Sequence, residues 1–211
     1  MCDMKIGILA IQGDIEENIE ATTRALSSMS LQGKVIPIRY ADELRKVNGL
    51  ILPGGESTAI GHMLALNPEM SHTLQERLLN GMPALGICAG MIVLAKKAYD
   101  MAVGEINQHL LNVLDIVVER NSFGRQHESF EADLAIHGLG ADPFKGVFIR
   151  APSVKSVGRQ VRVLGRLAEK VIAVQQGSLI GTSFHPELSG DARFHMRLIK
   201  QVSESENTTH S

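Results

Sequence analysis

The chain contains few of the residues on which several classes of protein depend. It has no tryptophan, two tyrosines and two cysteines among 211 residues. The two cysteines, Cys2 and Cys88, cannot build the dense disulfide framework of a small secreted domain. We expect Cys2 to lie in a frayed N-terminus, so a disulfide with Cys88 is not expected either. In a reducing compartment a lone internal cysteine is either an inert buried residue or a working thiolate.

Long apolar runs and an excess of positive charge are also lacking. No run reaches the length of a transmembrane helix, and Met1–Lys5 leads into an apolar segment without the layout of a signal peptide. The formal net charge is -2 and the basic residues are scattered, whereas nucleic acids and anionic membranes are bound by concentrated basic surfaces. We therefore expect a cytoplasmic protein with neither a nucleic-acid nor a membrane partner.

The chain does have a regular alternation of apolar runs and helical patterns. Because 44% of the residues are hydrophobic, we predict a single domain over residues 1–211, with a polar, disordered tail at 203–211. The first half predicts strands at Lys5–Ile11, Val35–Ile38, Gly49–Leu52 and Pro83–Ile87, and helices at Asp14–Ser28, Asp42–Val47, from Ser57, at Glu69–Asn80 and at Met91–Ala98. The second half predicts strands at Val113–Glu119, Gly146–Ile149, Gln160–Leu167, Lys170–Gln175 and Ser178–Phe184, and a helix at Ala192–Val202.

This order of elements predicts an α/β fold. Alternating strands and helices are typical of a parallel sheet with helices on both faces. The strands of the second half are separated by turn residues, so we expect several of them to pair antiparallel. The prediction is a three-layer structure with a mainly parallel central sheet and additional antiparallel strands.

Cys88 lies in the segment Gly86–Gly90 (GICAG), between a predicted strand and a predicted helix. This is a nucleophile-elbow pattern, in which a sharp turn requires small residues two positions before and after the nucleophile. The turn would place the thiol at the carboxyl end of the sheet and at a helix N-terminus, which favours the thiolate. The alternative is a buried structural cysteine between packing glycines, and the elbow alone does not decide between them.

A thiolate nucleophile needs a base, and His185 in Phe184–Glu187 (FHPE) is the strongest candidate. Pro186 disfavours a helical conformation at His185. In an extended segment Glu187 points the same way as His185 and can orient the ring. The other seven histidines are interpreted as surface or capping residues. A strand-end turn with two solvated polar residues is the alternative for FHPE, which the elbow and FHPE together disfavour.

The segment Pro53–Thr58 (PGGEST) follows the third predicted strand. Its two glycines allow backbone N–H groups to approach a bound anion or oxyanion closely. We predict an oxyanion hole formed by the N–H groups of Gly55 and Ala89. The loop lacks the Gly-Lys-Ser/Thr ending of a phosphate-binding loop, and a turn that caps a helix is the remaining alternative.

These motifs, in this order, resemble those of class I (triad-type) glutamine amidotransferases. The resemblance is closer to the Pdx2 family (also SNO or PdxT), the glutaminase subunit of pyridoxal 5'-phosphate synthase, and it covers about residues 4–202. It rests on Ala10–Gly13 (AIQG), Leu52–Thr58, Val118–Gln126 (VERNSFGRQ), Ser129–Glu131 (SFE) and Phe148–Pro152 (FIRAP).

The resemblance implies a flavodoxin-like fold and hydrolysis of L-glutamine to glutamate and ammonia, without metal or cofactor. It also implies delivery of the ammonia to a Pdx1-type synthase in a hetero-oligomer. By position, it implies a triad of Cys88, His185 and Glu187. The segments that match glutamine-binding regions supply Gly55, Glu56, Ser57, Arg120, Ile149 and Arg150. An arginine suits the substrate carboxylate, and Glu56 suits its ammonium group.

Three other functions remain open at this point. The chain could be a class I amidotransferase that serves another synthase, against which the RNSFGRQ and FIRAP segments argue. It could be a cysteine peptidase or related hydrolase on a similar scaffold. It could also be a non-catalytic regulatory subunit, although the complete triad set argues against a lapsed enzyme.

Overall fold

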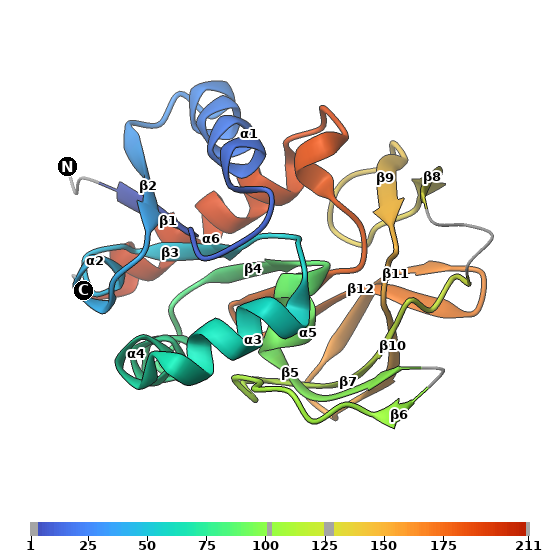
Figure 1. Ribbon diagram of the computed structural model, residues 1–211. Coiled ribbons are helices and arrows are strands. Elements are labelled where there is room, and N and C mark those ends of the chain that lie inside the picture. The colour runs from blue at the N-terminus through green and yellow to red at the C-terminus, as the bar shows by residue number, and fades with distance from the viewer. Residues whose placement is uncertain (1–3, 101–102, 125–128, 210–211) are drawn as a thin grey trace.

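The computed structural model describes residues 4–100, 103–124 and 129–209 (Figure 1). The predictions for Cys2, and for Arg125–Gln126 at the end of the RNSFGRQ segment, lie outside these residues. Within the described ranges, no helix combines the length and the apolar character that a membrane crossing requires.

Five parallel strands form one half of the main sheet, with β2 at its edge. They follow one another in space in the order β2, β1, β3, β4 and β13, and every neighbouring pair is parallel. The last of them comes from far along the chain and lies beside β4. Their bounds are Met4–Leu9 for β1, Gly33–Ile38 for β2, Gly49–Leu52 for β3, Ala84–Ile87 for β4 and Leu179–Thr182 for β13.

Helices cover both faces of this parallel region (Figure 1). On one face lie α1 (Ile15–Ser28) and α6 (Arg193–Thr209); on the other lie α2 (Ala41–Leu44), α3 (Ser57–Leu66), α4 (Pro68–Leu79) and α5 (Ala89–Leu94). Successive strand residues point to opposite faces. Leu50 and Leu52 therefore join the hydrophobic cluster under α3 to α5, and Ile51 joins the cluster under α1 and α6.

Mostly antiparallel strands extend the sheet beyond β13, and only β5 and β7 among them pair parallel. The order continues as β12, β10, β7, β5 and β6, with β11 paired to β12, while β8 and β9 form a separate antiparallel pair. The bounds are Ala95–Asp100 for β5, Gly104–Glu105 for β6, Leu114–Arg120 for β7, Ser129–Leu134 for β8, Phe144–Ile149 for β9, Ser153–Val157 for β10, Arg162–Leu167 for β11 and Lys170–Gln176 for β12. The predicted fold class is confirmed.

The predicted helix at Met91–Ala98 is wrong in its second half. The helix α5 ends at Leu94, and the chain continues as β5, which pairs parallel with β7. A register shift between Ala95 and Lys97 leaves Lys96 and Lys97 both exposed, while Ala95 and Ala98 are buried. The bulge thus gives a strand the residue spacing of a helix.

The end of the chain also differs from the prediction. Where we expected a disordered tail from 203, the last helix α6 continues through Thr209. The serine and glutamate residues that follow Val202 are compatible with a helix, and Lys200 pairs with Glu204 one turn later, at 3.9 Å. A polar sequence is therefore sufficient to extend a helix that is already anchored on the sheet.

The parallel strands bring four loops to one edge of the sheet. Strands β1, β3, β4 and β13 are neighbours, so their carboxyl ends lie side by side. They lead into Gln12–Asp14, Pro53–Glu56, Cys88 and Ser183–His185, respectively. This edge is where α/β sheets place their ligands.

Candidate active site

Cys88 adopts the strained conformation that the elbow pattern predicts. Its φ is 48° and its ψ is -100°, and it directly precedes helix α5. A Cβ atom at Gly90 would overlap the carbonyl group of Leu52, and one at Gly86 would lie 2.9 Å from the amide nitrogen of Met91. The two glycines are therefore required by close approach of the backbone.

His185 lies beside Glu187, as the sequence predicts. The ring Nδ1 is 2.8 Å from Oε1 of Glu187, and the two side chains are 5% and 0% exposed. The local backbone differs from the expectation, because His185 is extended but Pro186–Leu188 forms a turn of 3-10 helix. Burial raises the pKa of the Glu187 carboxyl, although the hydrogen bond with His185 lowers it.

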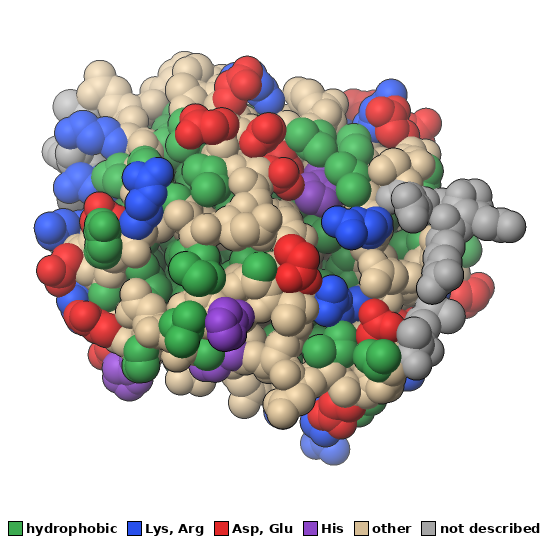
Figure 2. All heavy atoms as spheres, in the orientation of Figure 1, with side chains coloured by type: hydrophobic (Ala, Val, Ile, Leu, Met, Phe, Trp, Pro, Cys, Tyr) green, Lys and Arg blue, Asp and Glu red, His purple; other side chains and the backbone are tan. Residues whose placement is uncertain are grey.

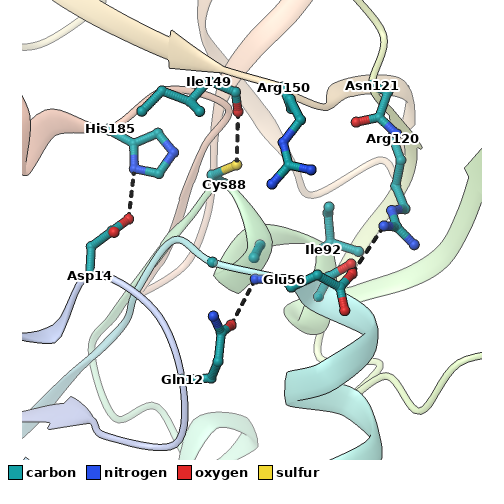
Figure 3. A pocket seen from close by; sticks show the side chains of 13 residues that line it. Gln12, Asp14, Glu56, Cys88, Ile92, Arg120, Asn121, Ile149, Arg150 and His185 are labelled. Carbon is teal, nitrogen blue, oxygen red and sulfur yellow. Dashed lines mark hydrogen bonds and ion pairs between the residues drawn. The ribbon is translucent and has the colours of Figure 1, made fainter. Parts of the chain in front are cut away.

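A second carboxylate contacts the same ring nitrogen. Oδ2 of Asp14, in the loop between β1 and α1, is 3.2 Å from Nδ1 of His185 (Figure 3). Burial lowers the pKa of His185, but hydrogen bonds with Asp14, Cys88 and Glu187 outweigh burial and raise that pKa well above its ordinary value. The sequence predicts Asp14 only as the first residue of a helix. Its place in the loop after the carboxyl end of the parallel strand β1 is the signal that could identify it.

A cavity of about 270 Å³ opens beside Cys88. It lies near the lower end of the range for small-molecule sites, roughly 300–1,000 Å³. All the predicted site residues except Glu187 line it, and Glu187 lies behind His185. Its lining comprises Gln12, Asp14, Gly55, Glu56, Ser57, Cys88, Ala89, Ile92, Arg120, Asn121, Ile149, Arg150 and His185. Acidic and basic side chains are interspersed over the face shown in Figure 2, which agrees with the prediction that the basic residues are scattered.

Glu56 and Arg120 form an ion pair at the wall of the cavity opposite His185 (Figure 3). Oε1 of Glu56 is 3.1 Å from a guanidinium nitrogen of Arg120, with side chains 43% and 22% exposed. Glu56 also caps α3, because it accepts hydrogen bonds from the amides of Thr58 and Ala59. Burial opposes ionisation of Glu56, but these amides and the Arg120 charge lower its pKa.

Backbone groups line the part of the cavity nearest the thiol. The Cys88 thiol points to the carbonyl oxygen of Ile149, with Sγ and O 4.0 Å apart. Gly55 and Ala89, the predicted oxyanion pair, are brought to the same cavity. The next amide, that of Glu56, donates to Oε1 of Gln12 at 2.7 Å and so fixes the loop after β3 against the loop after β1.

The remaining predicted residues lie around this cavity. Ser57 begins α3 and is 3% exposed, whereas Arg150 is exposed. Arg150 has a φ of 41°, which bulky residues rarely adopt, whereas asparagine tolerates the φ of 50° that Asn121 has. Cys88 and Arg150 are therefore two strained residues that line one cavity, and such strain is concentrated at functional sites.

The donor atoms of Asp14, His185 and Glu187 lie within 4.8 Å of one another. Such a group is also compatible with a metal ion. Here the 2.8 Å contact between His185 and Glu187 has the length of a hydrogen bond, and Asp14 lies within ion-pair distance of the same ring nitrogen, so contacts among the three side chains account for their grouping. That the reaction uses no metal remains a prediction.

A buried thiol on an elbow, beside a histidine that contacts carboxylates, defines a cysteine–histidine site on an α/β sheet. A solved structure described as "Crystal structure of glutamine amidotransferase" shares this fold with a TM-score of 0.81 and 40% identity, and the match covers 94% of this chain and 98% of that chain. The chain belongs to the SNO glutamine amidotransferase family, which it matches over residues 8–204. The predicted family resemblance is confirmed.

Two curated relatives of the chain carry the same name. The pyridoxal 5'-phosphate synthase subunit PdxT of Nitrosopumilus maritimus is 44% identical, with 95% of this chain and 98% of the relative covered. The protein of the same name from Frankia casuarinae is 46% identical, with 97% and 98% covered. A glutamine amidotransferase from Thermotoga maritima, at 14% identity and a TM-score of 0.61, shares the fold.

Proposed function

We propose that this chain is the glutaminase subunit of a pyridoxal 5'-phosphate synthase, and that it acts as one domain. It hydrolyses L-glutamine to L-glutamate and ammonia, and a Pdx1-type synthase subunit receives the ammonia. The names of the relatives and the family membership support this assignment. The observation that carries the chemistry is the strained Cys88 beside a histidine whose Nδ1 is held by carboxylates.

The arrangement of His185 supports a definite sequence of proton transfers. Since Nδ1 faces Glu187 and Asp14, Nε2 is left for the thiol. His185 takes the proton of Cys88, and the thiolate attacks the side-chain amide carbon of glutamine while the carbonyl electron pair moves to oxygen. Backbone N–H groups, for which Gly55 and Ala89 are our candidates, stabilise that oxyanion.

Two bond cleavages complete the reaction. The imidazolium of His185 gives its proton to the amide nitrogen, so the C–N bond breaks, ammonia leaves and a thioester remains on Cys88. His185 then takes a proton from water, and the hydroxide attacks the thioester. The C–S bond breaks, which releases glutamate and restores the thiolate. A cytoplasmic location is part of the proposal, because the nucleophile has to remain a free thiol, as Cys88 is here.

Substrate recognition uses the opposite wall of the cavity. Arg120 and Arg150 suit the α-carboxylate of glutamine, and Glu56 suits the α-ammonium group. The ammonia must not reach bulk water, because at neutral pH it would become ammonium, which is a poor nucleophile. We therefore expect turnover to be low for the chain alone and to rise when the synthase subunit docks.

The test measures glutamate release from L-glutamine, with and without the Pdx1-type subunit. Cys88→Ala should abolish release in both conditions, whereas Cys2→Ala, at the only other cysteine, should not. Activity in Cys88→Ala would contradict the mechanism. Strong activity that ignores the partner would indicate another synthase, and a wild-type chain that is inactive in both conditions would indicate a non-catalytic subunit.

A further inference from the structure

Asp14 occupies the N-cap position of helix α1 but does not cap it. Aspartate at this position ordinarily accepts a hydrogen bond from an amide of the first helical turn. Here the Asp14 side chain makes no such bond. One of its oxygens lies instead 3.2 Å from Nδ1 of His185. The side chain thus forgoes a local contact, which stabilises helices in general, for a contact across the active site.

The backbone of Asp14 is held from both sides. Its amide donates to the carbonyl oxygen of Gly54 at 3.2 Å, and its own carbonyl oxygen accepts from the side-chain amide of Asn18 at 2.7 Å. Asn18 is fully buried, and its Oδ1 lies 3.3 Å from Nε2 of His195 in helix α6.

Asn18 fixes the direction of this buried network. The sequence suggested a surface or capping histidine at 195, but His195 is completely buried. Burial, and then the charge of Arg24, lower its pKa to about 4. Because Nδ2 of Asn18 donates to the carbonyl oxygen of Asp14, Oδ1 of Asn18 faces His195 and accepts from its Nε2.

Gly54 provides the space in which Asp14 meets His185. A Cβ atom at Gly54 would lie 2.8 Å from both Oδ2 of Asp14 and Nδ1 of His185. Glycine is therefore the residue that permits the contact. Gly13 packs equally closely, since a Cβ atom there would overlap the carbonyl oxygen of Gly54. The loops after β1 and β3 are in backbone contact directly beside the histidine.

We propose that Asp14 is a positioning residue, a second carboxylate that holds the His185 ring from the β1–α1 loop while Glu187 holds it from the buried side. The inference rests on the proposed function, because it assigns Asp14 a part in the same proton transfers. The charged or titratable groups around the ring are Asp14, Glu187 and Cys88, with Arg150, Arg120 and Glu56 farther along the same cavity.

The two carboxylates differ in exposure, and so in their expected effect. The Glu187 side chain is 0% exposed and the Asp14 side chain 36%. Water screens the partly exposed charge, so Asp14 should influence His185 less than Glu187 does. Because Asp14 lies on a loop at the surface, anything that moves this loop also moves the second carboxylate. The pair thus links the surface beside α1 to the catalytic base.

The experiment compares Asp14→Asn, Asp14→Ser and the control Glu17→Gln, which removes one exposed negative charge from the first turn of the same helix. The readout is the pH at which His185 loses its proton, followed by the NMR signal of its ring. The rate at which iodoacetamide alkylates Cys88 is followed in parallel. Neither measurement uses glutamine.

We expect Asp14→Asn to move the His185 titration to lower pH by about one unit, because an adjacent anion favours the imidazolium. Asp14→Ser should cause the same shift, although serine can supply the helix cap that Asp14 does not make, and Glu17→Gln should cause none. An unchanged titration in Asp14→Asn would overturn the proposal. A shift that occurs in Asp14→Asn but not in Asp14→Ser would overturn it too, because it would show that the effect depends on capping α1.

Glutaminase activity separates this inference from the proposed function. An active wild-type chain in which Asp14→Asn leaves the titration unchanged contradicts the role of Asp14 alone. An inactive wild-type chain whose His185 still shifts contradicts the glutaminase assignment but supports the contact. In an active chain, Asp14→Asn should lower kcat while KM changes little. The alkaline limb of the pH profile of kcat should move to lower pH, together with the His185 titration.

Discussion

The two walls of the active-site cavity are built differently. On one wall, His185 is almost completely buried and hydrogen-bonded to Glu187, which lies buried behind it. On the other, Glu56 and Arg120 form an ion pair with side chains 43% and 22% exposed. The hydrogen bond between His185 and Glu187 is one that the proposed reaction keeps from start to finish. The ion pair between Glu56 and Arg120 is one that a bound zwitterionic amino acid could replace with contacts to its own two charges.

Under the proposed function, this difference separates the groups that carry out the chemistry from those that recognise the substrate. Proton transfer needs groups held in place before the substrate arrives, and burial provides this. Recognition of a free amino acid needs one positive and one negative group. In the structure, the two groups on this wall, Arg120 and Glu56, neutralise each other. A glutamine molecule would exchange one internal ion pair for two contacts with its own charges. Variants of the first wall should therefore affect kcat, and variants of the second should affect KM.

The largest expected effect comes from the buried wall. Glu187→Gln keeps the shape of the side chain but removes the charge that fixes the His185 tautomer, so kcat should fall by about 10³-fold or more. KM should change little, because Glu187 does not line the cavity. Steady-state kinetics of glutamate release would measure both values.

The matched control for this variant is Glu69→Gln. Glu69 is an exposed carboxylate on helix α4, and it pairs with Arg45. It should leave kcat and KM unchanged. If Glu187→Gln retained the wild-type kcat, His185 would not depend on its buried partner, and the comparison of the two walls would fail.

A smaller effect is expected from the exposed wall. Arg120→Lys keeps the charge but loses the planar guanidinium that contacts Glu56 and Thr58. A charged hydrogen bond contributes roughly 1.5–3 kcal/mol, so KM should rise about 10- to 100-fold while kcat falls much less. Arg45→Lys, in an exposed ion pair elsewhere, should change neither value. A fall confined to kcat would place Arg120 with the catalytic groups.

Most of the buried wall could be predicted from local sequence. The elbow around Cys88 and the FHPE segment each follow a strand, and parallel strands place their carboxyl ends at one edge. Asp14 follows a strand of the same kind, but an aspartate before a helix has the simpler interpretation of an N-cap. Only the three-dimensional contact with His185 shows that its side chain turns elsewhere.

The exposed wall could not be derived from residue patterns alone. Arg120 ends β7, which reaches the site only through the antiparallel order of the second half, and resemblance to a family was needed to select it. The sequence predicts helix through Ala98, over the first part of β5, because a bulge between Ala95 and Lys97 disturbs the alternation of exposed and buried residues. Non-local pairing and bulges leave weak local signals.

The smallest expected effect concerns the pH dependence of stability. The folded-state pKa of Glu56 is lowered by its cap hydrogen bonds and by Arg120, although burial opposes this. A lowered pKa means that the ionised carboxylate stabilises the fold above the pKa of the unfolded chain. This stabilisation is lost as the pH falls through the lowered folded value.

Glu56→Gln should therefore reduce the free energy of unfolding more at neutral than at acidic pH. Because the side chain is 43% exposed, the difference should be only a few tenths of a kcal/mol up to about 1 kcal/mol. Urea unfolding of both proteins at the two pH values would measure it, and an equal loss at both would show that the exposed pair adds no charge-dependent stability.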